Sequence, residues 1–186
     1  MTKPFIIIPN FISPERADAL GKEYMQFCED VKETPDPQAE LSYSTYGYIT
    51  FFELLMEKLP EVVEIVGEPL FPTYCYSRVY KNGSILEAHK DREKCEVSLT
   101  VHLCGDEDWN FWVKDDQGKR HDISLNQGDA LLYYGMQSMH GRTTKYLGQY
   151  YTQVFLHYVK TRGDYSDPYK VHLLRTGQIN KDDLGL

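Results

Sequence analysis

The sequence predicts one mostly β domain with supporting helices, built on a double-stranded β-helix, or jelly roll, core. Apolar and polar residues alternate with a period of two in most segments after residue 70, which is typical of strands with one buried face. The chain also contains 15 tyrosines, and tyrosine suits a half-buried wall with a wet edge. At 186 residues the chain is long enough for one well-packed core, so we expect a single domain, 1–186.

The amino-terminal part, residues 1–69, is expected to form a strand and supporting helices. A β-branched run at 5–8 ends at a proline and predicts the first strand. Ser13 followed by Pro14 is typical of a helix start, and apolar residues then recur at helical spacing to about residue 30. This helix is expected to lie against a sheet.

A loop and further helix are predicted next. Residues 33–41 contain two prolines among acidic side chains, which indicates an exposed loop. Two helical pieces are then expected, at 51–59 and 60–66, with a proline at the start of the second. The first piece is expected to bury an apolar stripe of Phe52, Leu55, Met56 and Leu59.

Residues 70–160 are predicted to form the double-stranded β-helix core. About seven short strands with turn signals between them describe a jelly roll rather than a helical bundle. The expected strands are 73–80, the segment around residue 89, 97–103, 109–113, 121–125, 129–134 and 149–159. Residues 161–186 follow as a polar carboxy-terminal extension.

A histidine and a carboxylate stand two residues apart at His89 and Asp91. In an extended strand both side chains leave from the same face, so both can bind one metal ion. A third donor, His140, follows the apolar strand at 129–134. Two histidines and one carboxylate leave three coordination positions open, an arrangement that suits iron(II) enzymes. The sequence therefore predicts a metalloenzyme, and an oxygenase in particular.

Composition excludes several other classes of function. The net charge of −8 and pI near 5.2 argue against a non-specific grip on nucleic acid or anionic lipid. No apolar run is long enough for a membrane helix, and the first residues do not have the pattern of a signal peptide. The four cysteines have no zinc-site spacing and are expected to be reduced thiols. We expect a cytoplasmic protein, and the sequence predicts no oligomeric state.

Three short motifs follow one another in the β-rich part of the chain. They are Arg78-Val79-Tyr80-Lys81-Asn82-Gly83, then His89-x-Asp91, and then Gly128-Asp129-Ala130-Leu131-Leu132-Tyr133 with His140 after it. In this order they resemble the 2-oxoglutarate- and iron(II)-dependent oxygenases, specifically their prolyl 4-hydroxylase-like branch. The resemblance covers about residues 70–160, and the strand at 5–11 with its Ser-Pro helix is similar to that branch as well.

The resemblance implies that His89, Asp91 and His140 ligate iron(II). It implies that 2-oxoglutarate and O2 are cosubstrates, with ascorbate as an optional reductant, and that a C–H bond is hydroxylated while 2-oxoglutarate becomes succinate. Tyr80, nine residues before His89, stands where related enzymes place a tyrosine that reaches the cosubstrate. The branch acts on peptides, proteins and small molecules, and a prolyl or other peptidyl residue is the first expectation.

The partner of the cosubstrate's distal carboxylate departs from the family pattern. The family sets an arginine or lysine nine or ten residues after the distal histidine, where this chain has Gln149 and Tyr150. A buried carboxylate needs a cationic partner. We expect Arg142 to take this role because its planar fork fits a carboxylate, with Tyr150 donating a further hydrogen bond. Lys145 and Arg78 are the reserve candidates.

Two other classes of function stay open. One is a cupin-like metal-binding barrel that does not use 2-oxoglutarate, and the other is a non-catalytic binding module. Titration with iron(II) and 2-oxoglutarate separates these classes. An oxygenase needs both, a cupin-like barrel needs the metal alone, and a binding module needs neither. Substrate contacts are expected at Arg92 and in the segments 33–44 and 136–140, whereas His102 is expected to be a structural histidine.

Overall fold

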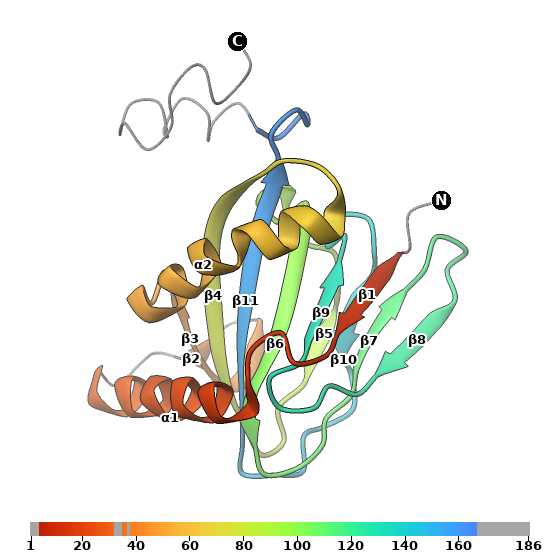
Figure 1. The fold of residues 1–186 in the computed structure, drawn as a ribbon. Coiled ribbons are helices and arrows are strands. Elements are labelled where there is room, and N and C mark those ends of the chain that lie inside the picture. Colours follow the sequence, from red (N-terminus) through yellow and green to blue (C-terminus); the bar gives the residue numbers. More distant parts are fainter. Residues whose placement is uncertain (1–3, 32–34, 37, 167–186) are drawn as a thin grey trace.

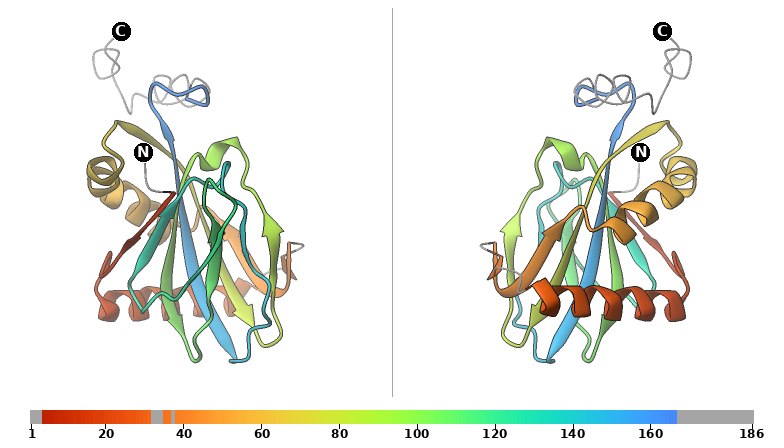
Figure 2. Two further views of the ribbon diagram at one scale, coloured as in Figure 1. Left: turned by 90° about the vertical axis from the view of Figure 1, so that its right-hand side faces the viewer. Right: turned by 90° about the vertical axis from the view of Figure 1, so that its left-hand side faces the viewer.

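The computed structural model of the chain describes residues 4–31, 35–36 and 38–166. Its core is a pair of antiparallel sheets, and α2 crosses in front of the central strands of the larger one (Figure 1). Figure 2 shows the same arrangement from its two sides. The predicted mostly β jelly roll with supporting helices is confirmed. Within the described residues, no helix is long and apolar enough to cross a membrane.

The larger sheet contains seven strands in the described part of the chain. Their order across the sheet is β1 (Phe5–Ile8), β9 (Ala130–Tyr133), β6 (Val97–Gly105), β11 (Tyr150–Lys160), β4 (Leu70–Lys81), β3 (Ala39–Tyr46) and β2 (Pro35–Asp36). The predicted amino-terminal strand is confirmed as β1, which pairs with β9 through Ile6 opposite Leu132.

The smaller sheet carries the segment around His89. Its order is β5 (Leu86–His89), β10 (His140–Arg142), β7 (Phe111–Lys114) and β8 (Arg120–Ile123). A single 3-10 turn, η1 (Glu93–Cys95), follows β5. Since β5 and β10 are neighbours, His89 and His140, 51 positions apart in sequence, meet at one edge of the core.

The central strands of the larger sheet have two different faces. On β11, Val154 and Leu156 pack in the core cluster that includes the helices. The alternate residues, Gln153 and Phe155, therefore face the smaller sheet, because successive side chains point to opposite faces. β4 lies antiparallel beside β11, with Tyr80 opposite Tyr151 and Arg78 opposite Gln153. This polar and aromatic inner face forms one wall of the candidate site.

The first predicted helix is confirmed as α1 (Pro14–Val31), and the backbone N–H of Arg16 donates to Oγ of Ser13 over 3.2 Å. The two predicted helical pieces are one helix, α2 (Ile49–Val66), with Pro60 inside it. Proline removes the hydrogen bond to the carbonyl four residues earlier, on Met56. The helix tolerates this loss because Met56 lies on its exposed side.

The predicted apolar stripe of α2 is wrong at two positions. Phe52 and Met56 are exposed, and the buried positions of the helix are Phe51, Leu54, Leu55 and Val62. The helix has an almost continuous apolar run at 51–56, so its sequence does not determine which of two adjacent stripes meets the sheet.

The exposed loop predicted at 33–41 is also wrong within the described residues. Residues 35–36 form β2, and β3 begins at Ala39. Asp36 is only 3% exposed, because its carboxylate binds Nε of Arg78 over 2.8 Å. Residues 33, 34 and 37 lie outside the described residues, as does the larger part of the predicted extension, 167–186.

Candidate metal and cosubstrate site

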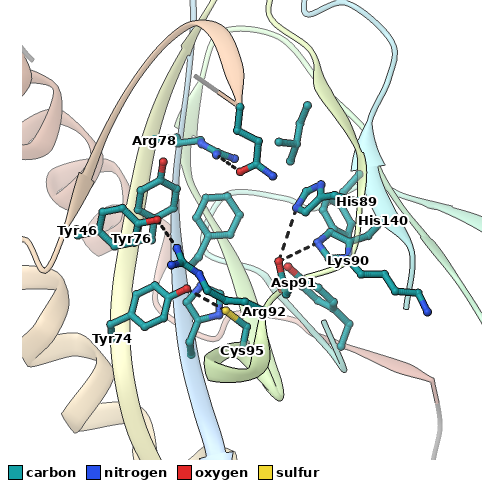
Figure 3. Close-up of a pocket in the computed structure, with 16 residues that line it drawn as sticks. Tyr46, Tyr74, Tyr76, Arg78, His89, Lys90, Asp91, Arg92, Cys95 and His140 are labelled. Atoms are coloured by element: carbon teal, nitrogen blue, oxygen red, sulfur yellow. Dashed lines mark hydrogen bonds and ion pairs between the residues drawn. The ribbon is translucent and has the colours of Figure 1, made fainter. Parts of the chain in front are cut away.

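The candidate site is a cavity of about 300 Å³ lined by residues of both sheets. His89, Asp91 and His140 lie at one side of it, and a group of tyrosines lies at the other (Figure 3). Phe111, Tyr133 and Phe155 also line the cavity.

The three predicted metal ligands come together. His89 ends β5 and His140 begins β10, and the two residues are directly paired in the antiparallel register. Oδ1 of Asp91 lies 3.6 Å from Nε2 of His89 and 3.4 Å from Nε2 of His140 (Figure 3). One donor atom from each residue lies within 4.8 Å of the other two, which is close enough to hold one ion.

Both imidazole rings are oriented by the backbone. Nδ1 of His89 lies 2.7 Å from the carbonyl of Glu87, and Nδ1 of His140 lies 2.8 Å from the carbonyl of Ser138. A carbonyl only accepts, so each Nδ1 carries the hydrogen and each Nε2 keeps its lone pair. Metal-binding histidines are fixed in this way in proteins, so the donor set fits a metal ion.

The ionisation states also fit a metal. Burial alone would raise the pKa of Asp91, but the close contact with His140 and the other nearby imidazoles lower it to about 2. Burial lowers the pKa of His89, and the proximity of His140 adds to this effect. At neutral pH the site therefore presents a carboxylate and a neutral imidazole, the forms that bind metals.

Gly135 allows the carboxylate to sit where it does. A Cβ at this position would lie 2.0 Å from Oδ2 of Asp91, and the Gly135 carbonyl accepts the backbone N–H of Asp91 over 2.9 Å. Sequence reasoning missed this residue, although the glycine directly follows the strand at 129–134.

Arg142 is a buried cation, 1% exposed, on the same strand as His140. Residues two positions apart on a strand, such as His140 and Arg142, face the same side and stand roughly 7 Å apart. Its Nη2 lies 3.3 Å from the Tyr151 hydroxyl and 3.4 Å from Oε1 of Gln153, and its Nη1 donates to the carbonyl of Trp109. Within the described part of the chain it forms no ion pair, and its Nε has no hydrogen-bond partner. An unneutralised buried guanidinium fits a bound carboxylate.

Tyr80 is fully buried and faces the same interior. Its ring meets that of Trp109 edge to face at 4.9 Å, and its hydroxyl accepts a hydrogen bond from Nη1 of Arg78 over 3.3 Å. It is paired across the sheet with Tyr151, whose hydroxyl reaches Arg142. Tyr80 therefore lies on the inner face of β4 beside Arg78, outside the lining of the cavity, and its contact with the cosubstrate stays a prediction.

Tyr150, which was predicted to bind the cosubstrate, does not face this interior. Tyr150 packs against the helix-side core and lines a separate groove with Lys22 and Met25 of α1. Adjacent residues of a strand point to opposite faces, so Tyr151 faces the interior instead. Alternation along 149–159 identifies the residues that share a face of the strand. Which of the two faces meets the interior depends on packing against α1.

The reserve cations have other positions. The guanidinium of Arg78 is bound by Asp36 at 2.8 Å and by Oε1 of Gln38 at 2.6 Å, so its charge is already neutralised. Lys145 is exposed and lines a different surface cavity, next to Trp112. Arg142 is thus the buried cation without an ion-pair partner among the described residues, although Arg78, and not Arg142, lines the cavity.

Sequence reasoning missed a polar group behind Asp91. Oγ of Ser98 lies 3.1 Å from Oδ2 of Asp91 and 3.0 Å from Nδ1 of His157. Asp91, Cys95 and His157 form a second set of donor atoms within 4.8 Å of one another. His157 interrupts an apolar strand, which is a signal that could have pointed to this role. His102 is buried and Nδ1 contacts the carbonyl of Leu125, as a structural histidine would.

The metal ligands and Arg142 lie at different places along the inner face of β11. His157 and Ser98 place the metal ligands at one end of the inner face, and Tyr151 and Gln153 place Arg142 further along it. Among the described residues, Arg142, Tyr151 and Gln153 lie outside the lining of the cavity that holds the metal ligands.

Comparison with solved structures identifies the fold. The prolyl-4-hydroxylase of Pseudomonas putida matches with a TM-score of 0.68 and 15% identity, over 87% of this chain and 95% of that chain. HygX from Streptomyces hygroscopicus, with nickel and 2-oxoglutarate bound, matches with a TM-score of 0.64 and 17% identity, over 87% and 84% of the two chains. The fold is that of the 2-oxoglutarate- and iron(II)-dependent oxygenases.

A third oxygenase structure has the same fold. The collagen prolyl hydroxylase of Paramecium Bursaria Chlorella virus-1, in its complex with 2OG, matches with a TM-score of 0.63 and 14% identity, over 84% and 96% of the two chains. No family model and no curated protein sequence matches the chain. The likeness to 2-oxoglutarate oxygenases is thus a likeness of fold.

Proposed function

We propose that the protein is an Fe(II)- and 2-oxoglutarate-dependent dioxygenase that hydroxylates a C–H bond of its substrate. The observation that carries this proposal is the grouping of His89, Asp91 and His140 in an oxygenase fold, with both imidazoles fixed for metal binding through Nε2. A facial set of two histidines and one carboxylate leaves room for a chelating cosubstrate and O2.

The chain's own residues would bind the metal and the cosubstrate in two regions of the interior. His89, Asp91 and His140 would hold the metal, while Arg142 and the Tyr151 hydroxyl would bind the distal carboxylate of 2-oxoglutarate. Tyr80 would close the wall beside them. Bound iron(II) with 2-oxoglutarate supplies the oxidative decarboxylation to succinate and CO2 that is coupled to hydroxylation. Phe111, Tyr133 and Phe155, all buried, exclude water from this part of the cavity.

For the substrate, we propose only the chemical class. Two of the similar structures are prolyl hydroxylases, which supports a peptidyl or prolyl substrate, and the HygX structures support a small molecule equally. The segment 136–140 lies next to the metal ligands, as substrate contacts require. The cytoplasmic location, the absence of nucleic acid and membrane partners, and a use for ascorbate all stay predictions.

An anaerobic titration of the metal-free protein tests the proposal. Iron(II) is added first and 2-oxoglutarate second, and the visible charge-transfer band of the chelated keto acid is recorded. We expect the band to saturate near one equivalent in the wild-type protein and in His121→Ala, which removes a histidine of β8 outside the site. His89→Ala and Asp91→Ala should not form it.

The other outcomes separate the alternatives. Iron binding without a band would overturn the proposal in favour of a cupin-like metal barrel. Absence of both would indicate a non-catalytic binding module. Circular dichroism checks that each variant is folded, and we expect the metal-ligand variants to keep the wild-type spectrum.

A further inference from the structure

A wall of tyrosines lies across the cavity from the metal ligands. Tyr46 at the end of β3 and Tyr74 and Tyr76 on β4 line it together (Figure 3). The ring centroids of Tyr46 and Tyr76 are 4.4 Å apart, and those of Tyr46 and Tyr74 are 5.6 Å apart. Tyr46 is 59% exposed, so this wall extends from the cavity to solvent. The proposed cosubstrate site, at Arg142, leaves this wall unused.

Arg92 is held against the tyrosine wall. Its guanidinium lies 5.6 Å from the ring centroids of Tyr46 and Tyr74, and its Nη2 donates to the Tyr46 hydroxyl (Figure 3). Among the residues that the structure describes, it donates this one side-chain hydrogen bond and forms no ion pair. A guanidinium has five N–H donors, so its fork keeps donors for a ligand.

The charges that line the cavity favour an anion at this position. Arg78 is neutralised by Asp36, and the carboxylate of Asp91 belongs to the metal set. The remaining charged groups of the lining are Lys90 and Arg92, both cations, in a chain with a net charge of −8. Figure 3 shows Lys90 extending away from the tyrosines, which leaves Arg92 as the cation that faces them. A local cationic group on an acidic protein selects anionic ligands.

We propose that Arg92 binds an oxyanion of the substrate, a carboxylate or a phosphate, while the substrate's apolar or ring-bearing body lies on Tyr46, Tyr74 and Tyr76. Guanidinium binds either oxyanion through two parallel hydrogen bonds. The substrate is a small organic acid or phosphate ester, since a cavity of about 300 Å³ is at the lower end of ligand pockets. Its oxidation rests on the proposed function, but its binding does not.

The location of Arg92 determines which part of the substrate reacts. Arg92 directly follows the metal ligand Asp91, and both residues line the same cavity. An oxyanion held by Arg92 therefore keeps the neighbouring part of the substrate next to the metal ligands. The contact with Tyr46 orders the guanidinium before the ligand arrives, which reduces the entropy lost on binding.

Calorimetric titration of the metal-free protein, with a chelator present, tests the binding step. The probes are phenylacetate, phenyl phosphate and the neutral phenylacetamide. We expect at least one anion to bind tenfold or more tightly than phenylacetamide, and the better anion distinguishes a carboxylate from a phosphate substrate. Arg92→Gln should weaken that anion at least tenfold, and Arg92→Lys should weaken it less.

Two further variants control for charge and for the second arginine. Lys119→Gln removes one positive charge from the exposed turn between β7 and β8 and should bind the anion as the wild-type protein does. Arg142→Met should retain it as well, because Arg142 belongs to the cosubstrate end. The proposal would be overturned if the wild-type protein bound the anion and phenylacetamide equally tightly. It would also be overturned if anion binding survived in Arg92→Gln and disappeared in Arg142→Met.

The iron(II) and 2-oxoglutarate band distinguishes this proposal from the proposed function. We expect Arg92→Gln to form the band, since Arg92 lies outside the cosubstrate pocket. A wild-type protein that forms the band but shows no Arg92-dependent anion binding would overturn only the substrate proposal. Arg92-dependent anion binding without a band would instead overturn the oxygenase function.

Discussion

The hydroxyl of Ser98 lies 3.1 Å from Oδ2 of Asp91, the carboxylate oxygen that faces away from the two metal-site histidines. The same hydroxyl lies 3.0 Å from Nδ1 of His157. A hydroxyl has only one hydrogen to donate. When Ser98 donates to Asp91, Nδ1 of His157 must therefore donate to Ser98. The Cys95 carbonyl, 3.2 Å away, is the other acceptor within reach of this hydroxyl. When the hydroxyl donates to Asp91, the hydrogen bonds from His157 to Ser98 and from Ser98 to Asp91 hold Oδ2 and leave Oδ1 for the metal.

Ser98→Ala should weaken iron(II) binding about tenfold, because second-shell partners of metal ligands contribute on that scale. The measurement is a competition titration of iron(II) against a chromophoric chelator. Ser77→Ala is the matched control, since Ser77 is an equally buried serine of the same sheet whose hydroxyl contacts the Thr45 carbonyl. Equal iron affinity in the Ser98 and Ser77 variants would contradict the positioning role.

The free energy of unfolding of the metal-free protein should decrease as the pH is lowered from about 6.5 to about 4. Burial lowers the pKa of His157 to about 4, while nearby Asp91 opposes the shift. In this range the unfolded chain binds a proton that the folded chain does not, so stability is present above pH 6.5 and decreases as pH falls. A shift of this size corresponds to about 3 kcal/mol.

His157→Asn removes the titrating group and keeps a donor beside Ser98. Urea unfolding at pH 7.5 and at pH 4.5 gives the pH-dependent loss for each protein. We expect a smaller loss in the variant than in the wild-type protein. Burial also lowers the pKa of His89 and of His102, but both proteins contain these residues, so the difference reports on His157. An identical loss in both proteins would refute this assignment.

Arg142→Met should raise the 2-oxoglutarate concentration needed for the charge-transfer band by about 30-fold or more, since loss of a buried charge partner costs about 2 kcal/mol at least. Iron(II) affinity should change little. Arg142→Lys should recover part of the loss. Arg120→Met, the same substitution at an exposed arginine of β8, should behave as the wild-type protein does.

Stability separates a cosubstrate role for Arg142 from a structural one. In the ligand-free protein Arg142 is a buried cation without an ion-pair partner among the described residues. Its replacement by methionine should leave the free energy of unfolding unchanged or increase it, because burying an unpaired charge is costly. A large loss of stability together with normal 2-oxoglutarate binding would assign Arg142 to the core.

Asp36→Ala should destabilise the protein by about 3 kcal/mol, because it leaves Arg78 as an uncompensated buried charge. The double variant Asp36→Ala with Arg78→Met should recover part of that loss, since it removes both charges. Urea unfolding at pH 7.5 measures both proteins. If Asp36→Ala alone unfolded as the wild-type protein does, the ion pair would not anchor β2 to the site.

Several features could be predicted from local patterns. The period of two after residue 70 predicts a jelly roll, and the spacing of His89 and Asp91 predicts two donors on one face. Both are properties of neighbouring residues along one strand. His140 was predicted as the third donor because it follows the apolar strand at 129–134, and the pairing of β5 with β10 brings it to the site.

Other features depended on contacts between distant segments. Residues 35–36 were expected in a loop, but the charge of Arg78, 42 residues away, holds Asp36 in the interior. Tyr150 and Tyr151 are equivalent in the sequence, and only packing of β11 between α1 and the smaller sheet decides which one faces the interior. Periodicity therefore determined which residues share a face. Tertiary structure decided which face is inside, because burial depends on partners that the local sequence does not contain.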